Sequence, residues 1–137
     1  MATILILEDD PDLGPLLSTS LEAAGHSVTL VASAIAGEEA FRQNPADLVV
    51  ADLIIRQDGR PVADGGLLMI HRIKEIANEM RKTVPVIAIS GAIRRQGMTH
   101  ALSTAQHVGA DEVLAKPFPP EDLLWLIDRL LGEGKAG

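Results

Sequence analysis

Short apolar runs alternate with longer amphipathic segments along nearly the whole chain, and this alternation limits the possible folds more than any other feature. Each short run has about the length of a strand and is rich in leucine or β-branched residues. The runs cover residues 4–7, 28–31, 48–51, 86–89 and 113–115. Because they are apolar on both faces, they are typical of parallel strands covered by helices on both sides of a sheet.

The segments between these runs show the spacing of amphipathic helices. Their apolar stripes span residues 13–24, 36–41, 69–80, 101–108 and 123–130. Gly25 follows the first stripe as a helix stop, and Pro45 must end the second helix nearby. The sequence Pro119-Pro120-Glu121 suits the first turn of the fifth helix. The chain therefore predicts a strand followed by a helix, repeated five times.

This order of elements predicts a flavodoxin-like three-layer α/β fold, (βα)5, with a five-stranded parallel sheet in the order 2-1-3-4-5. Ligands of such sheets bind where strands 1 and 3 meet, at their carboxyl ends. The 137 residues suit one domain, which we expect over residues 1–131, followed by a flexible tail or linker start over residues 132–137. The polar stretch from Ile54 to Gly66 is expected to be a long loop.

The composition excludes several classes of protein. The chain has no cysteine, which rules out a disulfide scaffold, a thiol nucleophile and a cysteine-based metal site. Two phenylalanines and one tryptophan leave few rings on which a base or a flavin could stack. The net charge of -7 argues against direct binding of nucleic acid. No apolar run approaches the ~18 residues of a membrane span, so we expect a cytoplasmic protein that does not bind membranes.

Polar side chains follow four of the predicted strands, at the edge where this fold places its binding sites. Glu8 and Asp9 follow the first strand, Asp52 ends the third, Ser90 ends the fourth and Lys116 follows the fifth. Neighbouring carboxylates repel one another unless a cation lies among them, and Mg²⁺ prefers such oxygen ligands. A carboxylate, a metal ion, a lysine and a hydroxyl together indicate phosphoryl transfer onto the carboxylate.

Each of these residues also has a common structural explanation when it is taken alone. Acidic residues at the start of a helix often cap it, and we expect Asp10 and Asp12 to do so. A single aspartate, serine or lysine after a strand is usually a turn residue. It is their coincidence at one edge of the sheet that favours a functional site.

Four blocks of the sequence resemble the receiver domain of two-component response regulators. In chain order they are LEDDP at residues 7–11, DLVVADL at 47–53, VPVIAISG at 84–91 and GADEVLAKPF at 109–118. The resemblance extends to about Leu131 and implies the (βα)5 fold. It also implies an Mg²⁺ ion held by Glu8, Asp9, Asp52 and the backbone carbonyl of Ile54.

The resemblance further implies that Asp52 is the phosphoacceptor, that Ser90 and Lys116 contact the phosphoryl group, and that the Lys116-Pro117 peptide bond is cis. The phosphoryl group would come from a sensor histidine kinase or a histidine phosphotransfer protein. Such a domain catalyses only its own phosphorylation and dephosphorylation, so we do not expect a conventional enzyme. Phosphorylation would switch the face formed by the fourth helix, the fifth strand and the fifth helix.

Three departures from the family pattern affect these expectations. The loop from Ile54 to Gly66 is longer than usual, and the span from Ser90 to Lys116 is longer by about one helical turn. Val113 stands where the family usually has its switch aromatic. Trp125 falls on the polar side of the fifth helix, and a large exposed ring there is typical of a binding surface. We therefore expect a homodimer or partner contact that includes Trp125, although the ring could simply lie on its own helix.

Two other functions are compatible with the same fold. A degenerate receiver would act as a protein-binding module without phosphorylation, but the full set of acids, serine and lysine argues against this function. A flavodoxin-like cofactor protein would need aromatic residues in the loops after the third and fourth strands, and none occurs there. Uptake of phosphate from a small donor would separate the phosphoacceptor from the binding module.

Overall fold

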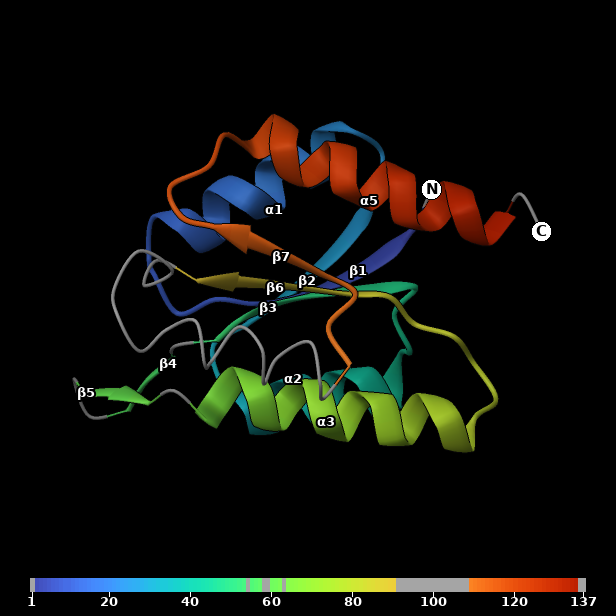
Figure 1. The fold of residues 1–137 in the computed structure, drawn as a ribbon. Coiled ribbons are helices and arrows are strands. Elements are labelled where there is room, and N and C mark those ends of the chain that lie inside the picture. The colour runs from blue at the N-terminus through green and yellow to red at the C-terminus, as the bar shows by residue number, and fades with distance from the viewer. Residues whose placement is uncertain (1, 54, 58–59, 63, 91–108, 136–137) are drawn as a thin grey trace.

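Five parallel strands form the central sheet of the computed structural model, which describes residues 2–53, 55–57, 60–62, 64–90 and 109–135 (Figure 1). The sheet has the order β2-β1-β3-β6-β7, which confirms the predicted order 2-1-3-4-5. Its strands are β1 (Thr3–Leu7), β2 (Ser27–Val31), β3 (Leu48–Asp52), β6 (Val86–Ser90) and β7 (Glu112–Ala115).

Helices cover both faces of the sheet and complete the predicted three layers. Figure 1 shows α1 (Leu13–Ala23) and α5 (Pro120–Lys135) on one face, and α2 (Ala34–Gln43) and α3 (Asp64–Glu79) on the other. Alternate residues of the inner strands supply two separate clusters of buried side chains. Leu5 and Val49 point to the α2 and α3 side, whereas Ile4 and Val50 point to the α1 and α5 side. The predicted fourth helix, over residues 101–108, lies outside the described residues.

Only the inner strands are buried on both faces as the sequence predicted. All five residues of β3 and all five of β6 are buried. The two edge strands, β2 and β7, are more exposed than the inner strands, because each has a neighbouring strand on one side only. No residue of β2 or β7 is fully buried, and Leu30 of β2 is exposed.

Two helices end in the same hydrogen-bonded motif, with a residue of positive φ after the last turn. After α1 this residue is Gly25 (φ 99°), as predicted, and the amide of His26 donates to the carbonyl of Leu21. After α3 the position is held by Arg81 (φ 56°), and the amide of Lys82 donates to the carbonyl of Ala77 at 2.8 Å. This left-handed conformation suits glycine much better than a residue with a side chain.

The stretch from Ile54 to Gly66 is not the long polar loop that we predicted. It contains an antiparallel hairpin of two short strands, β4 (Ile55–Gln57) and β5 (Arg60–Val62), and α3 already begins at Asp64. The physical reason lies in the sequence between the strands, because Asp58-Gly59 is a pair that strongly favours a two-residue hairpin connection.

Helix α5 continues past Leu131, where we expected the domain to end, and reaches Lys135. Glu121 and Asp122 lie in its first turn, where acidic side chains favour the helix dipole. The division into a domain over residues 1–131 and a tail over residues 132–137 stays a prediction. Within the described ranges, no helix is both long and apolar enough to cross a membrane.

Candidate functional site

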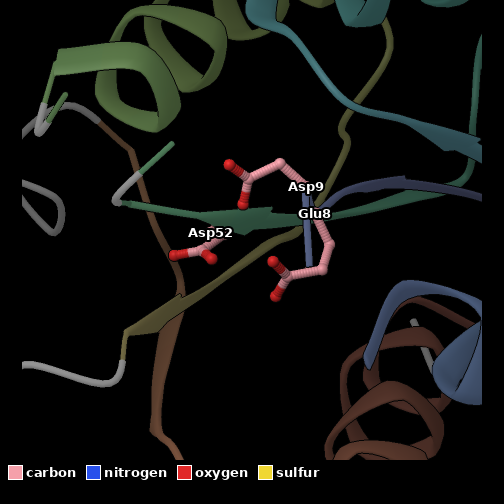
Figure 2. Close-up of side chains that lie close together, drawn as sticks. All are labelled: Glu8, Asp9 and Asp52. Atoms are coloured by element: carbon pink, nitrogen blue, oxygen red, sulfur yellow. The ribbon is translucent and has the colours of Figure 1, made fainter. Parts of the chain in front are cut away.

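The carboxyl ends of β1 and β3 bring three acidic side chains together. Leu7 pairs with Ala51 in adjacent strands, so Glu8 and Asp9 emerge beside Asp52. Oxygen atoms of the three carboxylates lie within 4.8 Å of one another, and Figure 2 shows the groups gathered around one space. Glu8 and Asp52 are each only 3% exposed, and Asp9 is half-buried. The convergence that the strand order predicted is therefore confirmed, and the donor set fits a hard divalent cation.

Lys116 enters this cluster from the end of β7. Its Nζ lies 2.7 Å from Oδ2 of Asp52 and 2.7 Å from Oε1 of Glu8. Its backbone amide donates to the carbonyl of Ser90 at 2.9 Å, and the peptide bond to Pro117 is cis, as the resemblance implied. The ammonium group thus balances part of the negative charge of two buried carboxylates.

Ser90 occupies the end of β6, the strand that lies between β3 and β7. It is fully buried, and it lies opposite Ala115 of β7. Its neighbour Ile89 pairs with Asp52 of β3. Ile54, which was expected to offer a carbonyl to the metal ion, lies outside the described residues. The structure therefore assembles Glu8, Asp9, Asp52 and Lys116, with Ser90 at the end of the strand between β3 and β7.

Burial changes the acidity of two groups in this site. It raises the pKa of Glu8 from 4.5 to about 7, while the contact with Lys116 opposes the rise and the charge of Asp52 adds to it. Burial lowers the pKa of Lys116, but the contacts with Asp52 and Glu8 outweigh this and raise it overall. Glu8 therefore titrates near neutral pH when no cation is present. A divalent cation among the carboxylates would favour its ionised form.

Glu8 and Asp10 also shape the connection between β1 and α1. The amide of Asp10 donates to Oε2 of Glu8 at 3.1 Å. Oδ1 of Asp10 accepts from the amides of Asp12 (2.8 Å) and Leu13 (3.0 Å), so Asp10 caps the start of α1 as expected. The same expectation for Asp12 was wrong. Its side chain makes no capping hydrogen bond. An N-cap side chain accepts from the second or third residue of the helix, but the amide of Gly14 donates to the carbonyl of Asp10 at 3.1 Å and Pro15 has no amide hydrogen.

Gly66 is a site residue that the sequence did not reveal. A Cβ atom at this position would meet the carbonyl oxygen of Asp52 and lie 2.8 Å from Cα of Leu53. The first turn of α3 therefore packs directly against the backbone that carries Asp52. The amide of Leu53 donates to the carbonyl of Ile89 at 2.9 Å, which holds the same backbone against β6. The residues Asp64-Gly65-Gly66 suggested a loop and gave no sign of this close approach.

Trp125 lies on the outer side of α5 and is 63% exposed. The guanidinium carbon of Arg129 lies 5.3 Å from the centroid of its ring, which is within the range of a cation–π contact. Arg129 also forms an ion pair with Glu112 of β7. Val113, at the position of the missing aromatic, packs against the core cluster on the α3 side.

The sequence profile of the response regulator receiver domain matches residues 4–128, which is most of the chain. The chain belongs to the response regulator receiver domain family. Receiver domains of this family are signalling modules of two-component systems.

Curated relatives contain this receiver domain as one part of a longer protein. The transcriptional regulatory protein RprY of Bacteroides fragilis is 32% identical over 131 residues, which cover 93% of this chain and 48% of RprY. The DNA-binding dual master transcriptional regulator RpaA of Synechocystis is 30% identical over 131 residues, covering 96% of this chain and 49% of RpaA. The receiver domain thus spans about half the length of these relatives.

Solved structures agree with the fold over nearly the full chain. The receiver domain of NtrX from Brucella abortus has a TM-score of 0.76 and 27% identity, and the match covers 94% of this chain and 98% of that one. The chemotaxis protein CheY4 of Vibrio cholerae has a TM-score of 0.76 at 20% identity, with 94% and 98% coverage. Because CheY4 is only 20% identical, its similarity shows the flavodoxin-like fold alone.

Proposed function

We propose that this receiver domain accepts a phosphoryl group on Asp52 from the phosphohistidine of a histidine kinase or histidine phosphotransfer protein. One observation carries the proposal: the buried carboxylate of Asp52 lies beside Glu8 and Asp9 and 2.7 Å from Nζ of Lys116. This is the combination of nucleophile, acidic pocket and fixed cation that phosphoryl transfer requires.

In the proposed step, a carboxylate oxygen of Asp52 attacks the phosphorus atom of phosphohistidine. A new O–P bond forms, the P–N bond breaks, and the imidazole leaves with the electron pair of that bond. The ammonium group of Lys116 offsets negative charge on the phosphoryl oxygens. The hydroxyl of Ser90 is the proposed hydrogen-bond donor to one of these oxygens once the acyl phosphate has formed.

Glu8, Asp9 and Asp52 are the proposed ligands of an Mg²⁺ ion, together with the carbonyl of Ile54. When bound, the ion would neutralise charge on the acids and on the phosphoryl oxygens. The fit rests on three carboxylates whose oxygens lie within 4.8 Å of one another. Burial raises the pKa of Glu8 to about 7, and a bound cation would favour its ionised, metal-binding form.

The proposed output is a change in the face formed by the fourth predicted helix, β7 and α5. An acyl phosphate adds about -1.5 to -2 charges, by analogy with phosphorylated hydroxyls. Ser90 lies at the end of β6, where the segment that leads to β7 begins, so a new bond there would bias the packing of this face. A homodimer or a partner protein is proposed to bind this face through Trp125, in the cytoplasm.

Phosphorylation by acetyl phosphate tests the assignment of Asp52. We expect the wild-type chain to gain one phosphate by mass spectrometry with Mg²⁺ and to gain none in excess chelator. Asp52→Asn should gain none under either condition, because an amide is not a nucleophile for phosphorus. Asp12→Asn is the matched control, since the side chain of Asp12 makes no capping bond, and it should behave as the wild type.

Phosphate uptake by Asp52→Asn at the wild-type rate would overturn the assignment. A wild-type chain that takes up no phosphate would instead support the binding module that acts without phosphorylation.

A further inference from the structure

The outer edge of β2 is open within the part of the chain that the structure describes, because β2 pairs with β1 alone. Its five residues pair one for one with those of β1, so the strand contains no bulge. It also contains no charged residue and no proline. Charge, proline, bulges and very short length are the usual features that prevent an edge strand from pairing with another chain. β2 has none of these protections.

The opposite edge of the sheet is better protected. β7 has four residues, and its first residue, Glu112, forms an ion pair with Arg129 of α5. Lys116 and Pro117 follow its last residue. β7 is therefore bounded by a charged residue at each end and by a proline, whereas β2 is the edge that favours addition of a strand.

The hydrogen-bonding groups on the open edge belong to Val28 and Leu30. The amide of Ser27 and the carbonyl of Val31 both form hydrogen bonds to the β1 side, at 2.9 and 3.0 Å. Main-chain groups of successive residues point to opposite sides of a strand. The amides and carbonyls of Val28 and Leu30 therefore point outward, on either side of the central residue Thr29.

Leu30 also places apolar surface beside this edge. Its side chain is 38% exposed and lies next to α1, since a Cβ atom at Gly14 would be 3.1 Å from Cδ2 of Leu30. Val28 packs against the core cluster on the same side of the sheet. A strand added here would cover part of Leu30, so apolar burial would stabilise the contact together with the main-chain hydrogen bonds.

We propose that two copies of this chain associate through β2, with the two strands antiparallel about a twofold axis at Thr29. In this register Val28 of each copy lies opposite Leu30 of the other, and the two residues exchange main-chain hydrogen bonds. Thr29 lies opposite the same residue of the second copy, and threonine pairs stabilise antiparallel strands. The two sheets then form one continuous sheet.

The charge of the chain favours a second copy as the occupant of this edge. Each copy has a net charge of -7, but β2 is uncharged, so two copies meet there without placing like charges opposite one another. The outward-facing residues are symmetric about Thr29, so all five residues of the two strands overlap. Added salt should strengthen the association, because it screens the repulsion between the negative copies.

Disulfide formation at position 29 tests the register. The chain has no cysteine, so Thr29→Cys introduces a single thiol. Cα atoms that lie opposite in such a pair are roughly 4.5 Å apart, which a disulfide can span. Ser27→Cys is the matched control, because Ser27 is exposed on the same strand. In the proposed register two Ser27 residues lie roughly 13 Å apart along the strands, too far for a disulfide.

With diamide as the oxidant, we expect Thr29→Cys to form a covalent dimer about tenfold faster than Ser27→Cys, or more, at equal concentration. Adding Asp52→Asn or Trp125→Ala to Thr29→Cys should leave its rate unchanged, because the contact uses neither residue. The inference is therefore independent of the proposed function. Equal rates for the two cysteine variants, or no dimer of Thr29→Cys, would overturn it.

Charge at position 29 gives a second test that needs no covalent bond. Like charges directly opposite destabilise a strand pair, and opposite charges stabilise it. In sedimentation equilibrium, Thr29→Lys and Thr29→Glu should each raise the dissociation constant of the dimer by about fivefold, and an equal mixture of the two should restore the wild-type value. Thermal unfolding confirms that each variant is folded.

Two results of the sedimentation experiment would overturn the inference. One is a mixture that associates no more tightly than the separate variants, which would exclude a twofold axis at Thr29. The other is a wild-type chain that stays monomeric at millimolar concentration, which would leave the open edge to a strand of another protein.

Discussion

At the scale of single residues, Glu8 is the side chain whose protonation depends most clearly on the fold. It follows a buried strand directly, and its carboxyl group is held between Lys116 and the amide of Asp10. Its position at a strand end could be predicted from the alternation of strands and helices. Its raised pKa could not, because that depends on burial among residues far apart in the chain.

The raised pKa of Glu8 makes stability depend on pH. The folded chain without metal keeps the Glu8 proton up to about pH 7, whereas the unfolded chain loses it near 4.5. The folded state binds more protons in this window, so the contribution to stability is complete below pH 4.5 and is lost as the pH rises through about 7. We expect the free energy of unfolding in chelator to fall over this range more steeply for the wild type than for Glu8→Gln.

Urea unfolding at a series of pH values measures this difference. Because groups remote from Glu8 titrate equally in both chains, the difference between the two curves comes from Glu8 and the groups that it contacts. Identical slopes between pH 4.5 and 7 would contradict the raised pKa.

Arg81 shows strain that a single substitution should relieve. It adopts φ 56° at the end of α3, where Gly25 has the equivalent position after α1. The left-handed conformation costs a residue with a Cβ atom roughly 1–2 kcal/mol, and the gain from glycine is offset in part by the entropy of the unfolded chain. We expect Arg81→Gly to raise the free energy of unfolding by about 0.5–1 kcal/mol.

Gly25→Ala is the matched comparison for Arg81→Gly and should lower the free energy of unfolding by a similar amount. Urea unfolding of both variants measures the two changes. A less stable Arg81→Gly chain would show that the arginine side chain stabilises this turn by more than the strain costs.

At the scale of elements, the first turn of α3 determines how the backbone of Asp52 is held. A Cβ atom at Gly66 would meet the carbonyl oxygen of Asp52, so Gly66→Ala must move either the helix or the end of β3. We expect a loss of about 1–3 kcal/mol in the free energy of unfolding, typical of overpacking. Phosphorylation by acetyl phosphate should also slow, because the acceptor is displaced from its partner Lys116.

Gly132→Ala is the control for Gly66→Ala. It lies in α5 with open space around its Cβ position, and it should stabilise the helix by up to about 1 kcal/mol. Denaturant unfolding and phosphorylation rates of both variants give the comparison. If the Gly66→Ala chain were phosphorylated at the wild-type rate, the close packing of Gly66 against the backbone of Asp52 would not be needed to position the acceptor.

The elements could be predicted to different degrees. The long helices and the inner strands carry their own periodic patterns, so their positions and order followed from the sequence. Residues 55–57 and 60–62 are too short for a periodic pattern, and the only signal for the hairpin was the Asp58-Gly59 pair between them. The exposure of β2 and β7 follows from their place at the two edges of the predicted strand order, although their apolar runs alone do not distinguish them from the inner strands.

At the scale of the whole molecule, the amino edge of the sheet is fixed by two aspartates that the sequence did not single out. Oδ2 of Asp47 accepts from the amide of Thr3 at 2.8 Å, and Oδ2 of Asp111 accepts from the amide of Val86 at 2.7 Å. Lys74 of α3 donates to Asp111 at 3.2 Å. These contacts join residues distant in the chain, so no local pattern predicts them. They fix the edge opposite the acidic site.

The exposed face of α5 gives a prediction about association. Trp125→Ala should leave folding and phosphorylation of Asp52 unchanged, because the ring is exposed outside the core and faces Arg129 of the same helix. It should weaken self-association or partner binding, since large exposed rings are frequent anchors of interfaces. Sedimentation of both chains, with and without beryllofluoride, measures self-association. Equal sedimentation of the two chains, together with equal partner binding, would show that Trp125 is an ordinary surface residue.

Trp125 is also the only tryptophan of the chain, and it is 63% exposed in the folded state. Its emission should therefore already be red-shifted before unfolding, so denaturation will change the spectrum little. Capture of the ring by another surface would shift the emission to shorter wavelengths and protect it from quenching by iodide. The protein thus carries an intrinsic fluorophore that reports contacts of α5 and responds little to events in the core.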